Sequence, residues 1–64
     1  MKVRDVLSVL YADGWRQTRQ RGSHRVLKHP TKPGIVVVPG HDSDEMAAGT
    51  LKSVWQQARI GGKP

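Results

Sequence analysis

Residues 35–38, Ile-Val-Val-Val, form a continuous β-branched run that constrains the fold of this chain more than any other segment. β-branched side chains pack well on a pleated surface, so this run predicts the most buried strand of a small sheet. The chain has 64 residues and no cysteine, so neither a disulfide nor a thiolate-bound zinc supports its small core. We therefore expect a single domain over residues 1–60 and a disordered tail over residues 61–64.

Apolar residues at helical spacing predict one helix near each end of the sequence. The first is expected over about Lys2–Asp13, with Gly14 as a left-handed residue that ends it. The second is expected to begin at Thr50 as its N-cap, after a polar connection over residues 41–49. The two apolar stripes are Val3, Val6, Leu7, Leu10 and Tyr11, and Leu51, Val54, Trp55 and Ala58.

The dipeptide Gly22-Ser23 predicts a hairpin turn between strands at residues 15–21 and 24–29. A two-residue turn of type II′ prefers glycine at its first central position. With this turn, Arg21 and His24 are directly opposed, and Arg19 opposes Val26 on the same face. A slip of one residue would move His24 to the other face of the sheet.

The expected order is a helix, three antiparallel strands and a second helix. Two helices can cover one face of such a sheet and leave the other face open to solvent. The predicted fold class is therefore α+β with two layers, in the arrangement of the double-stranded-RNA-binding domain. A fold does not by itself assign a function.

The net charge of +6 is concentrated in the middle third of the chain. Residues 14–34 contain six bases and no acid, whereas the rest of the chain has five of each. A local basic surface attracts phosphate backbones through the release of counterions. Charge also serves solubility, but a solubilising surface normally mixes both signs.

Several function classes are disfavoured by composition. No apolar run approaches the roughly 20 residues of a membrane span, and Asp5 precedes any long apolar stretch, which argues against a signal peptide. The lack of cysteine fits the cytoplasm. The histidines and acids show no pairing typical of a metal site, so we expect neither a metal nor a cofactor.

The segment 19–25, Arg-Gln-Arg-Gly-Ser-His-Arg, carries the candidate site. Histidine can move a proton near neutral pH, and arginine can hold a phosphate through two parallel hydrogen bonds. We expect His24 to act as a general base in cleavage of an RNA backbone, unless it only ends the turn. Arg25 should point away from His24 because neighbouring strand residues alternate between faces. The candidate RNA-binding residues are Arg19, Arg21, Gly22, Ser23, Arg25 and Lys28.

The remaining histidines and the tryptophans are expected to have structural roles. His29 precedes a proline at a strand end, and His41 has Glu45 four residues later, within reach of a local hydrogen bond. Trp15 and Trp55 supply area to a core that lacks phenylalanine.

A set of short motifs spread over nearly the whole chain resembles the HicA toxins. The motifs are Gly14-Trp15, residues 19–24, Val38-Pro39, His41 with Glu45, Gly49-Thr50-Leu51 and Gln57-Ala58. The resemblance implies a ribonuclease that cleaves mRNA without the ribosome, with His24 at the position of the catalytic histidine. It also implies a HicB antitoxin that covers the active face. Many members have an aromatic residue shortly after this histidine, where the present chain has Val26-Leu27.

Two other functions remain open from the sequence. The chain could be an RNA-binding module of the same fold without catalytic activity. It could also be a protein-interaction domain whose basic face docks an acidic partner.

Overall fold

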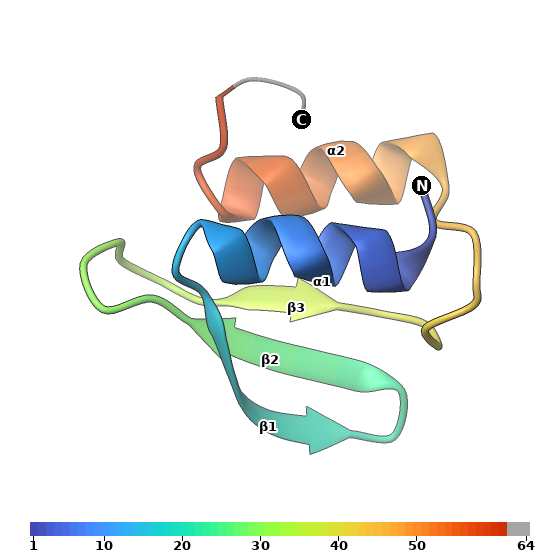
Figure 1. The fold of residues 1–64 in the computed structure, drawn as a ribbon, viewed down its shortest axis with the longest axis horizontal. Coiled ribbons are helices and arrows are strands. Elements are labelled where there is room, and N and C mark those ends of the chain that lie inside the picture. Colours follow the sequence, from blue (N-terminus) through green and yellow to red (C-terminus); the bar gives the residue numbers. More distant parts are fainter. Residues whose placement is uncertain (62–64) are drawn as a thin grey trace.

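Two helices and three strands follow one another in the predicted order in the computed structural model, which describes residues 1–61 (Figure 1). The strands form one antiparallel sheet in the order β1-β2-β3, and the predicted α+β class is confirmed. The expected tail at residues 61–64 lies outside the described residues apart from Gly61. The elements are α1 (Val3–Ala12), β1 (Arg16–Arg21), β2 (His24–Lys28), β3 (Val36–Val38) and α2 (Ala48–Gln57).

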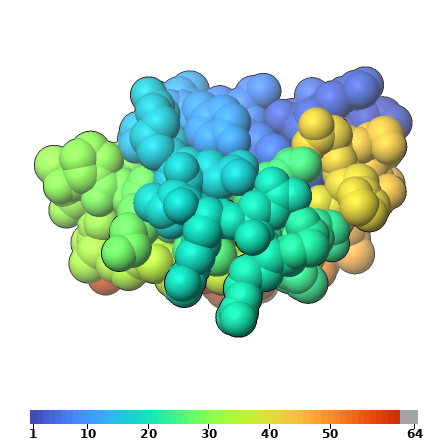
Figure 2. All heavy atoms as spheres, turned by 90° about the horizontal axis from the view of Figure 1, so that it is seen from below, coloured from blue at the N-terminus to red at the C-terminus, as the bar shows by residue number. Residues whose placement is uncertain are grey.

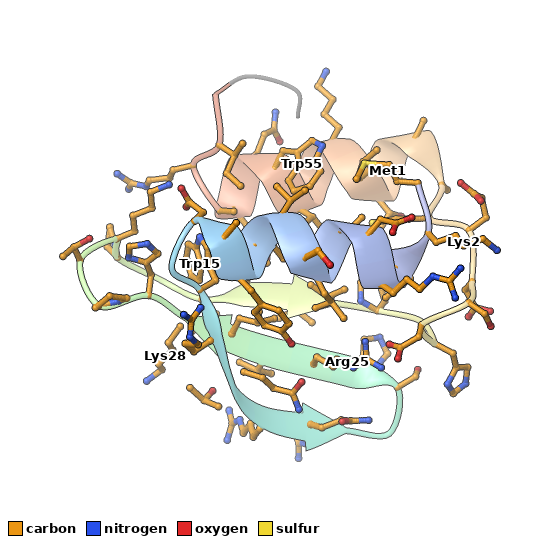
Figure 3. All side chains as sticks on the ribbon, viewed as in Figure 1. Met1, Lys2, Trp15, Arg25, Lys28 and Trp55 are labelled. Atoms are coloured by element: carbon orange, nitrogen blue, oxygen red, sulfur yellow. The ribbon has the colours of Figure 1, made fainter. Side chains whose placement is uncertain are left out.

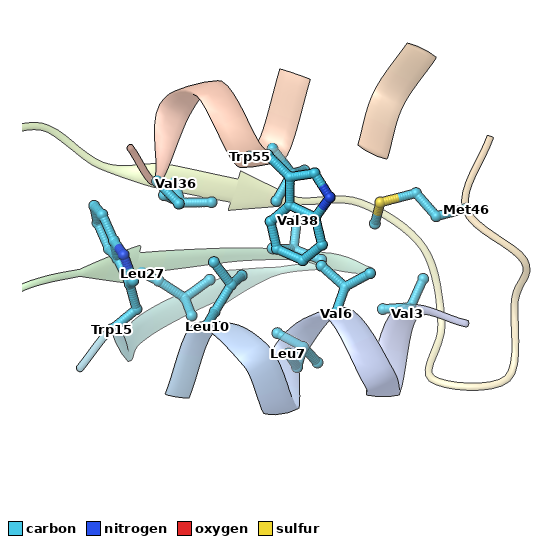
Figure 4. Packing of buried hydrophobic residues seen from close by; sticks show 12 residues of the cluster. Val3, Val6, Leu7, Leu10, Trp15, Leu27, Val36, Val38, Met46 and Trp55 are labelled. Atoms are coloured by element: carbon cyan, nitrogen blue, oxygen red, sulfur yellow. The ribbon is translucent and has the colours of Figure 1, made fainter. Parts of the chain in front are cut away.

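The core lies between one face of the sheet and the two helices (Figure 4). Leu27 of β2 and Val36 and Val38 of β3 are fully buried on this face. The β-branched run is therefore the buried strand that was predicted, with one correction: Ile35 lies before β3 and is 44% exposed. The helices and loops add Val3, Val6, Leu7, Leu10, Trp15, Met46, Val54, Trp55 and Ala58 to the cluster.

Both helices end in the same hydrogen-bond pattern, a Schellman motif. After α1, the Gly14 N–H donates to the Tyr11 carbonyl at 3.1 Å and the Trp15 N–H donates to the Leu10 carbonyl at 3.0 Å. The φ angle of Gly14 is +105°, as expected for the glycine that ends this helix. After α2, Arg59 takes the corresponding left-handed position with a φ angle of +56°.

The start of the second helix differs from the prediction. α2 begins at Ala48 with Ala47 as its N-cap, so Thr50 lies inside the first turn rather than at the cap. Met46 is buried, and its N–H donates to the Met1 carbonyl at 2.9 Å. This long-range attachment fixes the chain just before the helix, and the helix starts as soon as the attachment ends.

One lysine connects the ends of both helices. Lys32 Nζ donates to Asp13 Oδ2 at 2.6 Å, next to the end of α1, and to the Ala58 and Arg59 carbonyls at 3.2 and 3.3 Å, at the end of α2. A cation near the carbonyl end of a helix is favourable. The hydrogen bond from Lys32 is also the main cause that lowers the pKa of Asp13 below its ordinary value of 3.8.

Replacement of Gly14 by alanine should destabilise the fold more than the same change at Gly34. Both glycines have positive φ angles, but a Cβ at Gly14 would lie 2.7 Å from His29 Nε2, whereas a Cβ at Gly34 meets nothing within 4 Å. We expect Gly34→Ala to cost about 1 kcal/mol from backbone strain alone. Gly14→Ala adds overpacking, for a total of roughly 2–4 kcal/mol in urea unfolding. Equal costs would show that His29 moves aside freely.

The Asp13 ion pair should make stability fall in acid. A carboxyl whose pKa is lowered on folding stabilises the protein above its unfolded pKa and loses that contribution as the pH falls through the folded value. Urea unfolding should therefore show stability that begins to decline as the pH approaches 3.8 and continues to fall below it. Asp13→Asn should be less stable than wild type at neutral pH and should decline less. An identical pH profile for the two proteins would contradict this.

Candidate nucleic-acid interface

The hairpin of β1 and β2 has the predicted turn and the predicted register at its tip. Gly22 has a φ angle of +58° and Ser23 does not have a positive φ, which fits a type II′ turn. Arg21 is paired with His24, and Arg19 with Val26. His24, the candidate general base, and Arg21, the nearest arginine that could bind a phosphate, are therefore opposite each other, where cross-strand Cβ atoms are about 5 Å apart.

A β-bulge at Thr18 changes the register farther from the turn. Gln17 is paired with Leu27 and Arg16 with Lys28, so Thr18 is the extra residue. The Thr18 hydroxyl donates to the Val26 carbonyl at 3.2 Å. Without the bulge, Gln17 would lie on the same face as His24; the bulge turns it toward the helix side.

The sheet face away from the helices carries the basic residues. Leu27 points into the core, so His24, Val26 and Lys28 point to the open face by strand alternation. Arg19 and Arg21 lie opposite them on β1. Figure 2 shows long side chains of the hairpin segment that project from the side of the sheet away from α1. None of these bases pairs with an acid among residues 1–61.

His24 is exposed at the tip end of β2. Its imidazole makes no hydrogen bond within residues 1–61, so both ring nitrogens are available to a ligand. Gly22, in the adjacent turn, borders open space, and its carbonyl accepts a hydrogen bond from Gln20 Nε2 at 2.8 Å. Ser23 is half-buried in the turn.

Arg25 is separated from the other candidate residues. Its side chain is only 14% exposed, on the α1 side of the sheet, and its Nη2 lies 2.6 Å from Asp42 Oδ1 (Figure 3). As expected from strand alternation, it diverges from His24. The structure thus brings together Arg19, Arg21, His24 and Lys28 and places Arg25 on the opposite face.

The other two histidines have different surroundings. His29 packs edge-on against Trp15, with ring centroids 5.2 Å apart. Its Nδ1 accepts from the Thr31 and Lys32 N–H groups at 3.1 and 3.0 Å. The proton is therefore on Nε2, which donates to the Asp13 carbonyl at 2.6 Å. His29 is structural, as predicted.

The expected bond between His41 and Glu45 is absent. Glu45 instead accepts from the amino group of Met1 at 2.6 Å, and this hydrogen bond lowers the pKa of the Glu45 carboxyl. The His41 N–H donates to Asp44 Oδ2 at 2.9 Å. Met1 lies far from Glu45 in the sequence, so no local pattern could have indicated this exchange of partners.

Sequence reasoning missed an apolar strip within the basic face. Val26 is only 8% exposed although it faces away from the helices, and the exposed Ile35 lies near it. Thr18, Arg19, Val26, Lys28 and Ile35 line a shallow groove there. The β-branched run 35–38 predicts that Ile35 belongs to the buried strand, so no sequence pattern indicates this strip.

Within residues 1–61, no helix is long and apolar enough to cross a membrane. No group of three histidine or acidic side chains in that range is placed to hold a metal ion.

Replacement of Arg25 should affect the fold, whereas replacement of Arg21 should not. Arg25 buries its aliphatic stem and pairs with Asp42, so Arg25→Ala should cost about 1–2 kcal/mol of unfolding free energy in urea. Arg21 is exposed without an ion pair in the described part of the chain, so Arg21→Ala should stay within about 0.5 kcal/mol of wild type. Similar costs for both variants would argue against the burial of Arg25.

The fold and this interface define a class of protein: a small α+β domain with one open, basic sheet face that bears a histidine beside a hairpin turn. A family model described as the HicA toxin of bacterial toxin–antitoxin systems matches residues 3–60, and the chain belongs to this family. A comparison with curated proteins gave no match. Membership assigns the chain to the toxins and implies a cognate antitoxin.

Proposed function

We propose that this toxin is an endoribonuclease that cleaves mRNA independently of the ribosome, with His24 as its general base. The observation that carries the proposal is the position of His24. It is exposed, directly opposite Arg21, on a sheet face whose bases have no acidic partner among residues 1–61. A proton acceptor beside a phosphate ligand is the minimum that cleavage of RNA by its own 2′-hydroxyl requires.

In this reaction the His24 imidazole takes the proton of the 2′-hydroxyl. The oxygen then attacks the adjacent phosphorus: a bond forms between O2′ and phosphorus, and the bond from phosphorus to O5′ breaks. The leaving oxygen takes a proton from water. The step consumes no cofactor and needs no metal ion. Arg21, opposite His24 in the hairpin, would stabilise the negative charge that grows on the phosphate oxygens.

The other candidate residues of the open face have supporting roles in this proposal. Arg19 and Lys28 lie farther along the hairpin and would hold flanking phosphates. Gly22 leaves the turn without a side chain, so the RNA backbone can approach closely. Ser23 would donate a hydrogen bond to a phosphate oxygen.

We also propose that a HicB-type antitoxin silences the toxin in the cytoplasm by covering this open face. The face presents bases without acidic partners in the described part of the chain, so an acidic surface complements it. RNA and antitoxin would then compete for the same residues. Addition of the antitoxin should block RNA binding as well as cleavage.

Cleavage of a purified transcript by His24→Ala, compared with His41→Ala, tests the proposal. His41 is exposed on a loop outside the basic face and serves as the matched histidine control. We expect His24→Ala to lose about 10²- to 10⁴-fold in cleavage rate while it still binds RNA, and His41→Ala to behave as wild type. The same contrast should appear as loss or retention of growth arrest in bacteria.

Two outcomes would overturn this function. If wild type and His24→Ala bind RNA equally and neither cleaves it, the chain is an RNA-binding module. If neither protein binds RNA in a salt-sensitive way, the basic face is a protein-docking surface.

A further inference from the structure

We propose that a trough on the helix side of the hairpin binds one base of the RNA and sets the sequence preference of cleavage. This inference rests on the proposed ribonuclease function. The trough lies between α1 and the hairpin and has a volume of about 420 Å³. It is lined by Arg4, Leu7, Tyr11, Gln17, Gln20, Arg25 and Asp42.

The trough is open because no helix covers β1. All six residues of β1 are exposed, whereas β2 and β3 bury residues beneath the helices. Figure 1 shows β1 on the far side of β2 from β3 and α2. β1 is therefore a single layer, and both of its faces are accessible from the outer edge of the sheet.

Tyr11 supplies a surface on which a base can stack. The chain has two tryptophans, one tyrosine and no phenylalanine, and both tryptophans are buried, so Tyr11 is the exposed one of these three large rings. It continues the apolar stripe of α1 but is 37% exposed and lines the trough. Stacking on an aromatic ring accepts any base and contributes to affinity, and polar groups around the base provide selectivity.

Gln17 and Gln20 supply those polar groups. Residues three apart in a regular strand lie on opposite faces, but the bulge at Thr18 brings both glutamines to the helix side. Gln17 Nε2 donates to Gln20 Oε1 at 3.3 Å, and Gln20 Nε2 donates to the Gly22 carbonyl. The side-chain oxygen of Gln17, Oε1, accepts no hydrogen bond among residues 1–61. The side-chain amides of Gln17 and Gln20 therefore offer a free acceptor and further N–H donors to the edge of a nucleobase.

Arg4 supplies a contact to the adjoining phosphate. Arg4 makes no ion pair within residues 1–61. Arg25 is held in place by Asp42 through Nη2, while its buried Nη1 has no hydrogen-bond partner in the described part of the chain. Asp42 therefore neutralises Arg25, which forms part of the wall of the trough, and Arg4 is the cation left to contact a phosphate.

A short path connects the trough with His24. The pair Arg21 and His24 is next along the ladder to the pair Gln20 and Arg25, and the two pairs lie on opposite faces. Beyond them the hairpin consists only of the two turn residues. An RNA strand that crosses this tip would place the scissile phosphate beside His24 and a neighbouring base in the trough.

Tyr11→Leu, with Tyr11→Phe as its matched control, tests the inference. Cleavage would be measured on short RNA oligonucleotides in which each position around the cut site is varied. We expect Tyr11→Leu to raise KM by about tenfold with little change in kcat and to reduce the preference at one position. Tyr11→Phe keeps the ring and should behave as wild type. Gln17→Ala, a surface change, should weaken the same preference.

A second measurement does not depend on cleavage. Amide NMR spectra of the His24→Ala protein would be recorded with each of the four nucleoside 5′-monophosphates. We expect shifts at Leu7, Tyr11 and Gln20 that differ between bases and that vanish when Tyr11→Leu is added. This pattern would support the trough even if wild type cleaved no RNA.

The inference is overturned if wild type cleaves RNA and Tyr11→Leu does so with unchanged KM and preference, which leaves the ribonuclease proposal intact. It is also overturned if the monophosphates change the amide NMR signals of open-face residues only. Loss of antitoxin binding by Tyr11→Leu, with RNA cleavage unaltered, would overturn it in favour of a protein-docking pocket.

Discussion

The two ten-residue helices of this structure cover β2 and β3 but leave β1 uncovered, and the rest of the structure depends on that limit. The helices bury Leu27, Val36 and Val38, and this leaves β1 with no core residue. A strand with both faces in water must be polar on both, and the sequence Arg-Gln-Thr-Arg-Gln-Arg meets this requirement. Arginine on one face and glutamine on the other then give the hairpin two chemically different surfaces.

Local sequence chemistry predicted the elements well because their signals are local. The helical stripe of α1 and the Gly22-Ser23 turn each depend on residues close together in the chain, and both are confirmed. The turn also fixed the opposition of Arg21 and His24, since register follows from turn type. The opposition of Arg21 and His24 in the candidate site was therefore predictable from the seven residues 19–25 alone.

The remaining features were set by contacts between distant segments. Asp42 forms an ion pair with Arg25 from a loop distant in the sequence. Arg21 and Arg25, on either side of the Gly22-Ser23 turn, therefore differ: Arg25 is paired and largely buried, whereas Arg21 is exposed. Met1 attaches the segment before α2 and moves the start of that helix away from Thr50. The bulge at Thr18 has no mark in the sequence, yet it decides which face Gln17 occupies. The apolar side chains of Ile35 and Tyr11 predict burial. The sequence does not show how much surface of other elements is available to cover them, and both are exposed in the structure.

The lack of core residues in β1 also has a consequence for motion. Hydrogen bonds to β2 are the main attachment of this strand, and segments with few buried contacts open at lower free-energy cost than the core. The amide hydrogens of β1 are therefore expected to exchange with solvent before those of β2. A ligand bound across both faces of the hairpin, as proposed for RNA, would stabilise β1 against this opening, so that site occupancy and the order of the outer strand would be thermodynamically coupled.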